Sequence, residues 1–183
     1  MTHRIGIIVG SLRKASLNRL VANSLIKIGA DSFVAEIVEI SHLPHCNADH
    51  EDDPMQVIVD FKKLIESLDA ILFVTPEYNR GVPGVLKNAI DIASRPYGQN
   101  SWEGKPVGVI SVSPGELGGF GANHQLRQSF VFLNMPAMQQ PEAYIGNAGD
   151  LFDTDGELVD MSTVAFLREY LDAFVRWVGR CRA

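Results

Sequence analysis

Residues 5–19 read IGIIVGSLRKASLNR, and this stretch decides the fold because an unbroken apolar run leads directly into a cluster of polar side chains. The run 5–9 is continuous and rich in β-branched residues, which is typical of a strand covered on both faces of a parallel sheet. Ser16 then opens a helical pattern that ends at Gly29. A buried strand, a polar loop and a helix in this order predict an α/β fold that binds ligands at the carboxyl ends of its strands.

The same alternation continues along the chain. Further strands are expected at 33–40, 70–75, 107–112 and 137–145, and further helices at 54–68, 83–93, 122–132 and 162–180. Asp53 is expected to cap the helix that Pro54 begins. The order βαβαβαβαβα predicts a doubly wound five-stranded parallel sheet with helices on both faces. A chain of 183 residues, 46% of them hydrophobic, is long enough for one core and short for two, so 1–183 is expected to form a single domain.

Composition narrows the class of partner. The net charge of −6 argues against non-specific nucleic-acid binding, which needs a clustered excess of Lys and Arg. No apolar run approaches the roughly 18 residues of a membrane span. Cys46 and Cys181 lie far apart without a disulfide-framework spacing, and the chain starts without an apolar leader. We therefore expect a cytoplasmic protein whose partners are neither nucleic acids nor membranes.

The loop after the first strand lacks the known phosphate signatures of other α/β proteins. The glycines of GxGxxG, the Gly-Lys-Ser/Thr of a triphosphate loop and the nucleophilic Cys of a phosphatase loop are all absent. What remains is a metal-free set of donors beside the first turn of a helix, namely Ser11, Arg13, Ser16 and Asn18. Such a set suits one terminal phosphate. The structural alternative is that Ser16 only caps the helix and Arg13 is solvated.

Two later loops are predicted to face the same crevice, because they also follow strands of the sheet. In 75–91, TPEYNRGVPGVLKNAID, the ring of Tyr78, the rigid Pro76 and the amides of residues 77–79 could pack against a flat heterocycle. The alternative is an ordinary turn before a helix. In 113–121, SPGELGGFG, the glycines would allow close backbone approach to a ligand, or would form only a flexible turn.

The segments GSLRKASLNR (10–19), PEYNRGVPGVLKNAIDIASR (76–95) and SPGELGG (113–119) together resemble the NADPH-dependent FMN reductase family, in its branch of chromate, quinone and azo-dye reductases. The resemblance covers nearly the whole chain and implies a flavodoxin-like fold with non-covalent FMN. It places the FMN phosphate on Ser11, Arg13, Ser16, the Leu17 amide and Asn18. It places the isoalloxazine on Pro76, Glu77, Tyr78, Asn79 and Ser113.

The resemblance also implies an activity and an assembly. Hydride would pass from NADPH or NADH through FMN to quinones, azo dyes, chromate or free flavin by a ping-pong mechanism, with no obligatory acid or base side chain. Members are dimers or tetramers with the flavin near a subunit boundary. Some tetrameric members carry an Arg and a Tyr where this chain has Gly121 and His124, although Tyr78 and Glu142 are retained, so homodimer and homotetramer both stay open. The alternatives are a flavodoxin-type electron carrier without a nicotinamide site and a flavin-free scaffold domain.

Other conspicuous residues favour a structural interpretation. The loop with His42, His45, Cys46, Asp49 and His50 has no regular tetrahedral ligand spacing, so no metal site is expected. The stretch 153–157 begins like a calcium loop but lacks the later Glu, so a turn is expected. His124 is expected to be packed or solvated rather than catalytic. The apolar residues of 166–177 share helical spacing and are expected in the core.

Overall fold

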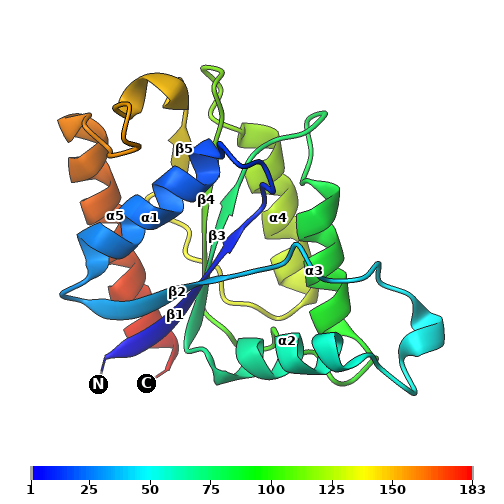
Figure 1. Cartoon of the computed structure of the whole chain (residues 1–183). Coiled ribbons are helices and arrows are strands. Elements are labelled where there is room, and N and C mark those ends of the chain that lie inside the picture. The colour runs from blue at the N-terminus through cyan, green and yellow to red at the C-terminus, as the bar shows by residue number, and fades with distance from the viewer. Residues whose placement is uncertain (1, 183) are drawn as a thin grey trace.

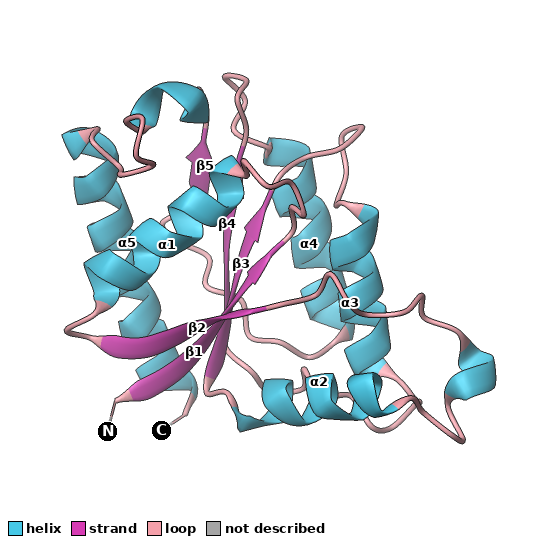
Figure 2. Ribbon diagram, viewed as in Figure 1, coloured by secondary structure: helices cyan, strands magenta, loops and turns pink. Residues whose placement is uncertain are grey.

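The computed structural model describes residues 2–182 and contains a five-stranded parallel sheet (Figures 1 and 2). Its strands are β1 (His3–Val9), β2 (Phe33–Val38), β3 (Ala70–Thr75), β4 (Val107–Val112) and β5 (Ala143–Ile145). They lie in the order β2-β1-β3-β4-β5, and all four neighbouring pairs are parallel. This 2-1-3-4-5 order is that of flavodoxin-like folds, so the predicted fold class is confirmed.

Five helices cover the two faces of the sheet, as Figure 2 shows. They are α1 (Leu17–Gly29), α2 (Gln56–Ser67), α3 (Gly84–Ser94), α4 (Phe120–Phe132) and α5 (Met161–Cys181). The helices α1 and α5 pack on one face, and α2, α3 and α4 pack on the other. Within residues 2–182 no helix combines the length and the apolar character that crossing a bilayer requires.

Each face has its own apolar core, because successive strand residues point to opposite sides. In β1, Ile7 contributes to the core under α1 and α5, whereas Ile8 contributes to the core under α2, α3 and α4. Burying a side chain of this size contributes about 1.5–3 kcal/mol. The predicted core residues of α5 are confirmed: Leu167, Tyr170, Leu171 and Phe174 are buried, and Phe166 and Trp177 pack partly buried against them.

Two sequence predictions about element ends were wrong. The helix α2 begins at Gln56, and its N-cap is Met55, which makes no side-chain capping bond. Asp53 is therefore no cap, and because this helix start is exposed, water can satisfy its free N–H groups. The strand predicted at 137–145 is reduced to β5 with one isolated bridge at Ala137. Pro136 and Pro141 bracket the lost segment, and proline cannot donate to a strand ladder.

Candidate functional site at the carboxyl edge of the sheet

Three loops meet at the carboxyl edge of the sheet, where β1, β3 and β4 end side by side (Figure 1). The amide of Gly10 donates to Val74 O at 2.8 Å, which carries the β1–β3 pairing into the first loop. A Cβ at residue 10 would lie 3.0 Å from Thr75 Oγ1 and 3.2 Å from Pro76 Cδ. Glycine is thus what allows the first two loops to approach each other at the point where strand order reverses.

The first loop ends in a capped helix start. Ser16 is the N-cap of α1, and its Oγ accepts from the Arg19 amide at 3.2 Å. Ser11 and Ser16 are both buried, at 4% and 3% exposure. The capping role considered as the structural alternative is therefore present. It does not compete with ligand binding, because the Ser16 hydroxyl proton remains free to donate.

Of the three cationic side chains near the start of α1, one forms an ion pair in the described part of the chain and two do not. Arg19 forms a bidentate pair with Glu39 at 2.7 and 2.8 Å, and this bond raises the pKa of Arg19 and lowers the pKa of Glu39. Arg13 and Lys14 are exposed and form no ion pair within residues 2–182. Two uncompensated cations therefore flank the positive end of α1, which suits an anionic group.

Asn18 provides the test of whether FMN fits here. Its side chain is 5% exposed, and the buried Oδ1 has no hydrogen-bond partner among residues 2–182. An unsatisfied buried polar group costs about 1–3 kcal/mol, so the site favours a ligand that completes it. An amide can present its oxygen or, after a half-turn about Cβ–Cγ, its nitrogen. FMN offers both matching partners, because its ribityl hydroxyls donate and its phosphate accepts, and the residues present therefore fit FMN.

The second loop contains a tight exposed turn. Tyr78 and Gly81 exchange backbone hydrogen bonds at 3.0 and 2.9 Å, and the two residues between them, Asn79 and Arg80, adopt left-handed φ angles of 51° and 65°. Each such non-glycine conformation costs about 1 kcal/mol. The turn leaves the side chains of residues 78–80 exposed at the edge. Because the Tyr78 amide is engaged in the turn, the amides of residues 77 and 79 are the better donors for a heterocycle.

Glu77 joins the second loop to α4, a role that the sequence did not indicate. Its Oε2 accepts from the Ala122 amide at 3.0 Å, and its Oε1 accepts from Arg80 at 3.3 Å. The N-cap of α4 is Gly119, which has no side chain to cap with. The one available signal was that a helix start without Ser, Thr, Asp or Asn needs a cap from elsewhere in the chain.

The third loop makes hydrogen bonds at its start and has a glycine in close contact with β5. The Ser113 amide donates to Ile145 O at 2.9 Å, and its hydroxyl oxygen accepts from the Gly115 amide at 3.0 Å. Gly118 has a φ of 59°, and a Cβ there would lie 2.7 Å from the backbone carbon of Tyr144. The glycine is thus required by both its conformation and its contact with β5, and the loop is held beside the second one through Gly119.

Known proteins resemble this chain over nearly all of its length. The NADPH-dependent FMN reductase family matches residues 3–150. The chain belongs to this family. A quinone reductase of Pseudomonas putida is 54% identical over 182 residues, covering 99% of this chain and 97% of the relative. A 2-hydroxy-1,4-benzoquinone reductase of Burkholderia is 40% identical, with 97% of each chain covered. The flavoenzyme NAD(P)H:(acceptor) oxidoreductase FerB of Paracoccus denitrificans superposes with a TM-score of 0.92 at 41% identity, covering 98% of each chain.

Membership of the FMN reductase family confirms the predicted enzyme class, the FMN cofactor and the reduced nicotinamide as electron donor. Local contacts surround Gly121 and His124, the two positions compared with tetrameric members from the sequence. At Gly121 a Cβ would meet Glu77 Oε2 and Arg80 O, each at 2.8 Å, so a larger side chain would disturb the Glu77 cap. His124 Nε2 lies 2.9 Å from the Tyr144 hydroxyl, and its ring packs against Phe120 in a tilted arrangement with centroids 4.2 Å apart. His124 is thus packed on its neighbours, as the sequence predicted.

Tyr144 is the titrating group of this cluster whose pKa is most altered. Partial burial, followed by the neighbouring Glu142 carboxylate, raises its pKa to about 12. The phenol therefore stays protonated across the physiological range.

The remaining conspicuous residues lie away from the three loops. Among residues 2–182 no three His, Cys, Asp or Glu side chains gather closely enough to hold a metal ion. Residues 153–157 form the predicted turn, in which Asp153 Oδ1 accepts from the amides of Asp155 and Glu157 at 3.0 and 2.9 Å. The Glu157 carboxylate pairs with Lys27 of α1.

Proposed function

We propose that the three loops bind FMN across the β1–β3 switch point. The phosphate would be held by Ser11, Arg13, Ser16, the Leu17 amide and Asn18, and the isoalloxazine by Pro76, Glu77, Tyr78, Asn79 and Ser113. The observation that carries this proposal is the buried Asn18 Oδ1, which has no hydrogen-bond partner within the described residues 2–182, beside the exposed Arg13 and the capped start of α1. A dianionic phosphate matches these donors without any metal ion.

FMN, when bound, supplies reversible uptake and release of a hydride equivalent. The chain supplies position and electrostatics. Pro76 is buried and rigid, and the exposed Tyr78 can cover one side of a flat ring. The amides of residues 77 and 79 can stabilise negative charge that develops on the ring. No side chain of the three loops needs to act as acid or base.

Quinones are the acceptors that we propose, with azo dyes, chromate and free flavin as further acceptors of the same open face. Two relatives, from Pseudomonas putida and Burkholderia, are named for quinone reduction. The edge of the site carries exposed apolar side chains, Tyr78, Leu117 and Phe120. An apolar edge of this kind suits a flat organic acceptor. A carrier protein would instead present a dense acidic patch for docking its protein partner. Because the loops leave one side of the ring open, nicotinamide and quinone would bind in turn, which gives a ping-pong mechanism.

Anaerobic mixing tests this proposal. FMN-loaded protein should bleach on addition of NADPH or NADH, regain its colour on addition of a quinone, and give parallel double-reciprocal lines in steady state. Intersecting lines would exclude the ping-pong mechanism while leaving the enzyme class intact. If neither nucleotide bleached the flavin, the protein would be an electron carrier, and if it took up no FMN it would be a scaffold.

We also propose that the chain works in the cytoplasm as one FMN-binding domain within a homodimer or homotetramer. Two apolar side chains at the end of α4, Val131 and Phe132, are each 83% exposed, and a second copy would bury them. Sedimentation at micromolar concentration should show a dimer at least, with flavin occupancy rising on association. A fully flavinated and active monomer would contradict this.

A further inference from the structure

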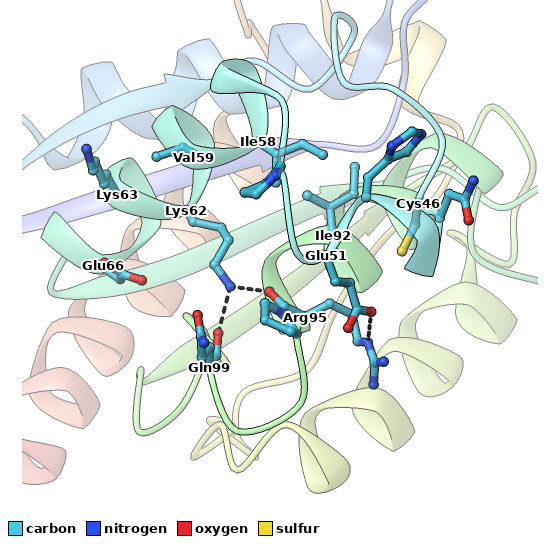
Figure 3. A pocket seen from close by; sticks show the side chains of 14 residues that line it. Cys46, Glu51, Ile58, Val59, Lys62, Lys63, Glu66, Ile92, Arg95 and Gln99 are labelled. Carbon is cyan, nitrogen blue, oxygen red and sulfur yellow. Dashed lines mark hydrogen bonds and ion pairs between the residues drawn. The ribbon is translucent and has the colours of Figure 1, made fainter.

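A cavity lies away from the three loops, between α2, the end of α3 and the loop 41–55 (Figure 3). Its volume is about 410 Å³, which is within the range of small-molecule sites. The helix α3 connects the two regions, because it begins just after the second loop and ends at this cavity. Its 11 residues span about 16 Å, so the cavity is separate from the proposed FMN site.

The wall of this cavity is largely apolar. Ile58 and Val59 come from α2, Ile92 comes from α3, and Pro54 and Pro96 close the sides. The loop that covers it is tied to α3 by Asn88, which accepts from the Cys46 amide at 2.8 Å and donates to Pro44 O at 2.8 Å. The cavity is therefore preformed and is suited to an apolar ring.

One partly buried cation faces this apolar wall. The Lys62 ammonium points across the cavity and donates to the backbone oxygens of Arg95 and Gln99 (Figure 3). An ammonium carries three donors, so one remains unused. Both acceptors are neutral, and burial lowers the pKa of Lys62, while the nearby Glu66 and Glu51 carboxylates act on it in the opposite direction.

The two carboxylates that act on Lys62, Glu51 and Glu66, also line the cavity, but each is hydrogen-bonded to another group. Glu51 accepts from Arg95 Nε at 2.6 Å, and Glu66 accepts from the Ser101 hydroxyl at 2.8 Å. Neither forms an ion pair with Lys62 in the part of the chain that the structure describes. An anion that entered the cavity would therefore meet an ammonium whose charge no protein carboxylate neutralises directly.

We propose that this cavity is a second small-molecule site, which binds an aromatic carboxylate with its ring among Ile58, Val59 and Ile92 and its carboxylate on Lys62. The ring removes apolar surface from water, and the carboxylate takes the free ammonium donor. A neutral ring of the same size gains only the first of these contributions. The site therefore selects for negative charge, independently of whether FMN is bound at the sheet edge.

The test uses FMN-loaded protein and naphthalene-2-carboxylate as the probe, with naphthalene-2-methanol as its neutral counterpart. Isoleucine and valine methyl NMR should show shifts at residues 58, 59 and 92, while the flavin absorbance stays unchanged. The carboxylate should bind at least about tenfold more tightly than the alcohol, as expected for a hydrogen bond to a charged group. Equal affinities, shifts elsewhere, a changed flavin spectrum or no binding at millimolar probe would each overturn the proposal.

Substitutions of Lys62 test whether its ammonium group binds the carboxylate of the probe. Lys62→Met should weaken carboxylate binding at least about tenfold and leave the alcohol unchanged, whereas Lys62→Arg should retain most of the affinity. Lys27→Met is the charge control, because Lys27 is an exposed lysine of α1 and does not line the cavity, whereas Lys63 does. A loss of affinity in Lys27→Met equal to that in Lys62→Met would contradict the assignment. FMN retention in all three variants separates this result from the FMN assignment.

Discussion

The sheet edge and the α2–α3 cavity are both suited to a ligand with an anionic group, but they are built differently. At the edge, three loops follow three strands, and the donors are backbone amides, hydroxyls and the exposed Arg13. In the cavity, the partly buried Lys62 ammonium faces an apolar wall formed by two helices, and Glu51, Glu66 and Arg95 also line the space. The comparison shows that strand ends present backbone amides and hydroxyls from several loops, whereas helix packing encloses an apolar wall beside long charged side chains.

The largest difference between the regions is expected from glycines at positive φ. Gly118 in the third loop has a φ of 59° and no room for a Cβ, whereas Gly98, beside the cavity-lining Gln99, has a φ of 84° and open space. Gly118→Ala should lower the free energy of unfolding by about 3 kcal/mol, from conformational strain plus overlap. Gly98→Ala should cost only the strain, about 1 kcal/mol. Urea unfolding curves measure the free energy of unfolding of both variants. Equal losses of stability would show that the close contact between Gly118 and β5 adds nothing to the conformational strain.

The next effect concerns the anion at the sheet edge. Arg13→Ala should weaken FMN binding by about 1.5–3 kcal/mol, because it removes a hydrogen bond to a charged group. Riboflavin, which has no phosphate, should bind the variant and the parent protein alike. Lys62→Met is the control from the other region and should leave FMN affinity unchanged. Fluorescence titration measures these affinities, and equal losses for FMN and riboflavin would refute the phosphate assignment.

A smaller effect is expected from the link between the second loop and α4. Glu77→Ala removes the carboxylate that accepts from the Ala122 amide and should destabilise the protein by about 1 kcal/mol, as the loss of a helix cap does. Glu77→Gln should lose less, because its amide oxygen can still accept. Glu116→Ala, an exposed change in the third loop, is the matched control. Thermal unfolding measures the loss of stability in each of the three variants. A loss in Glu116→Ala as large as that in Glu77→Ala would contradict the capping role.

The smallest effect is one of pH. Burial lowers the pKa of Lys62 from its usual 10.5, so this group loses its proton at lower pH than an exposed lysine. The cavity holds an anion only while Lys62 is protonated, and naphthalene-2-carboxylate affinity should therefore fall as pH rises through that lowered pKa. FMN affinity should stay level over the same range, because arginine remains charged. Binding titrations of naphthalene-2-carboxylate and of FMN at rising pH compare the two sites. If both affinities fell in parallel, the assignment of a lysine to one site and an arginine to the other would be contradicted.

The sequence by itself determined the order of strands and helices, the place of the first phosphate-type loop and the Ser16 cap. These features depend on short-range periodicity and on side chains within a few residues of the backbone they serve. The family motifs at 10–19, 76–95 and 113–119 also lie within single segments, which is why the amino-acid order alone is enough to indicate membership of the family. The predicted start of α2 and the predicted extent of β5 were wrong, because solvent at the helix start and the prolines at 136 and 141 decided these ends instead of apolar periodicity.

Only the tertiary structure decided which distant groups meet. Glu77 caps a helix that begins more than 40 residues later, and Gly121 is required because Glu77 and Arg80 occupy the space beside it. The unsatisfied Asn18 amide and the free donor of Lys62 likewise depend on burial, which periodicity does not specify residue by residue. The α2–α3 cavity exists because two helices and a tied loop enclose it, and the volume between packed elements is a property of their arrangement in space rather than of any one segment.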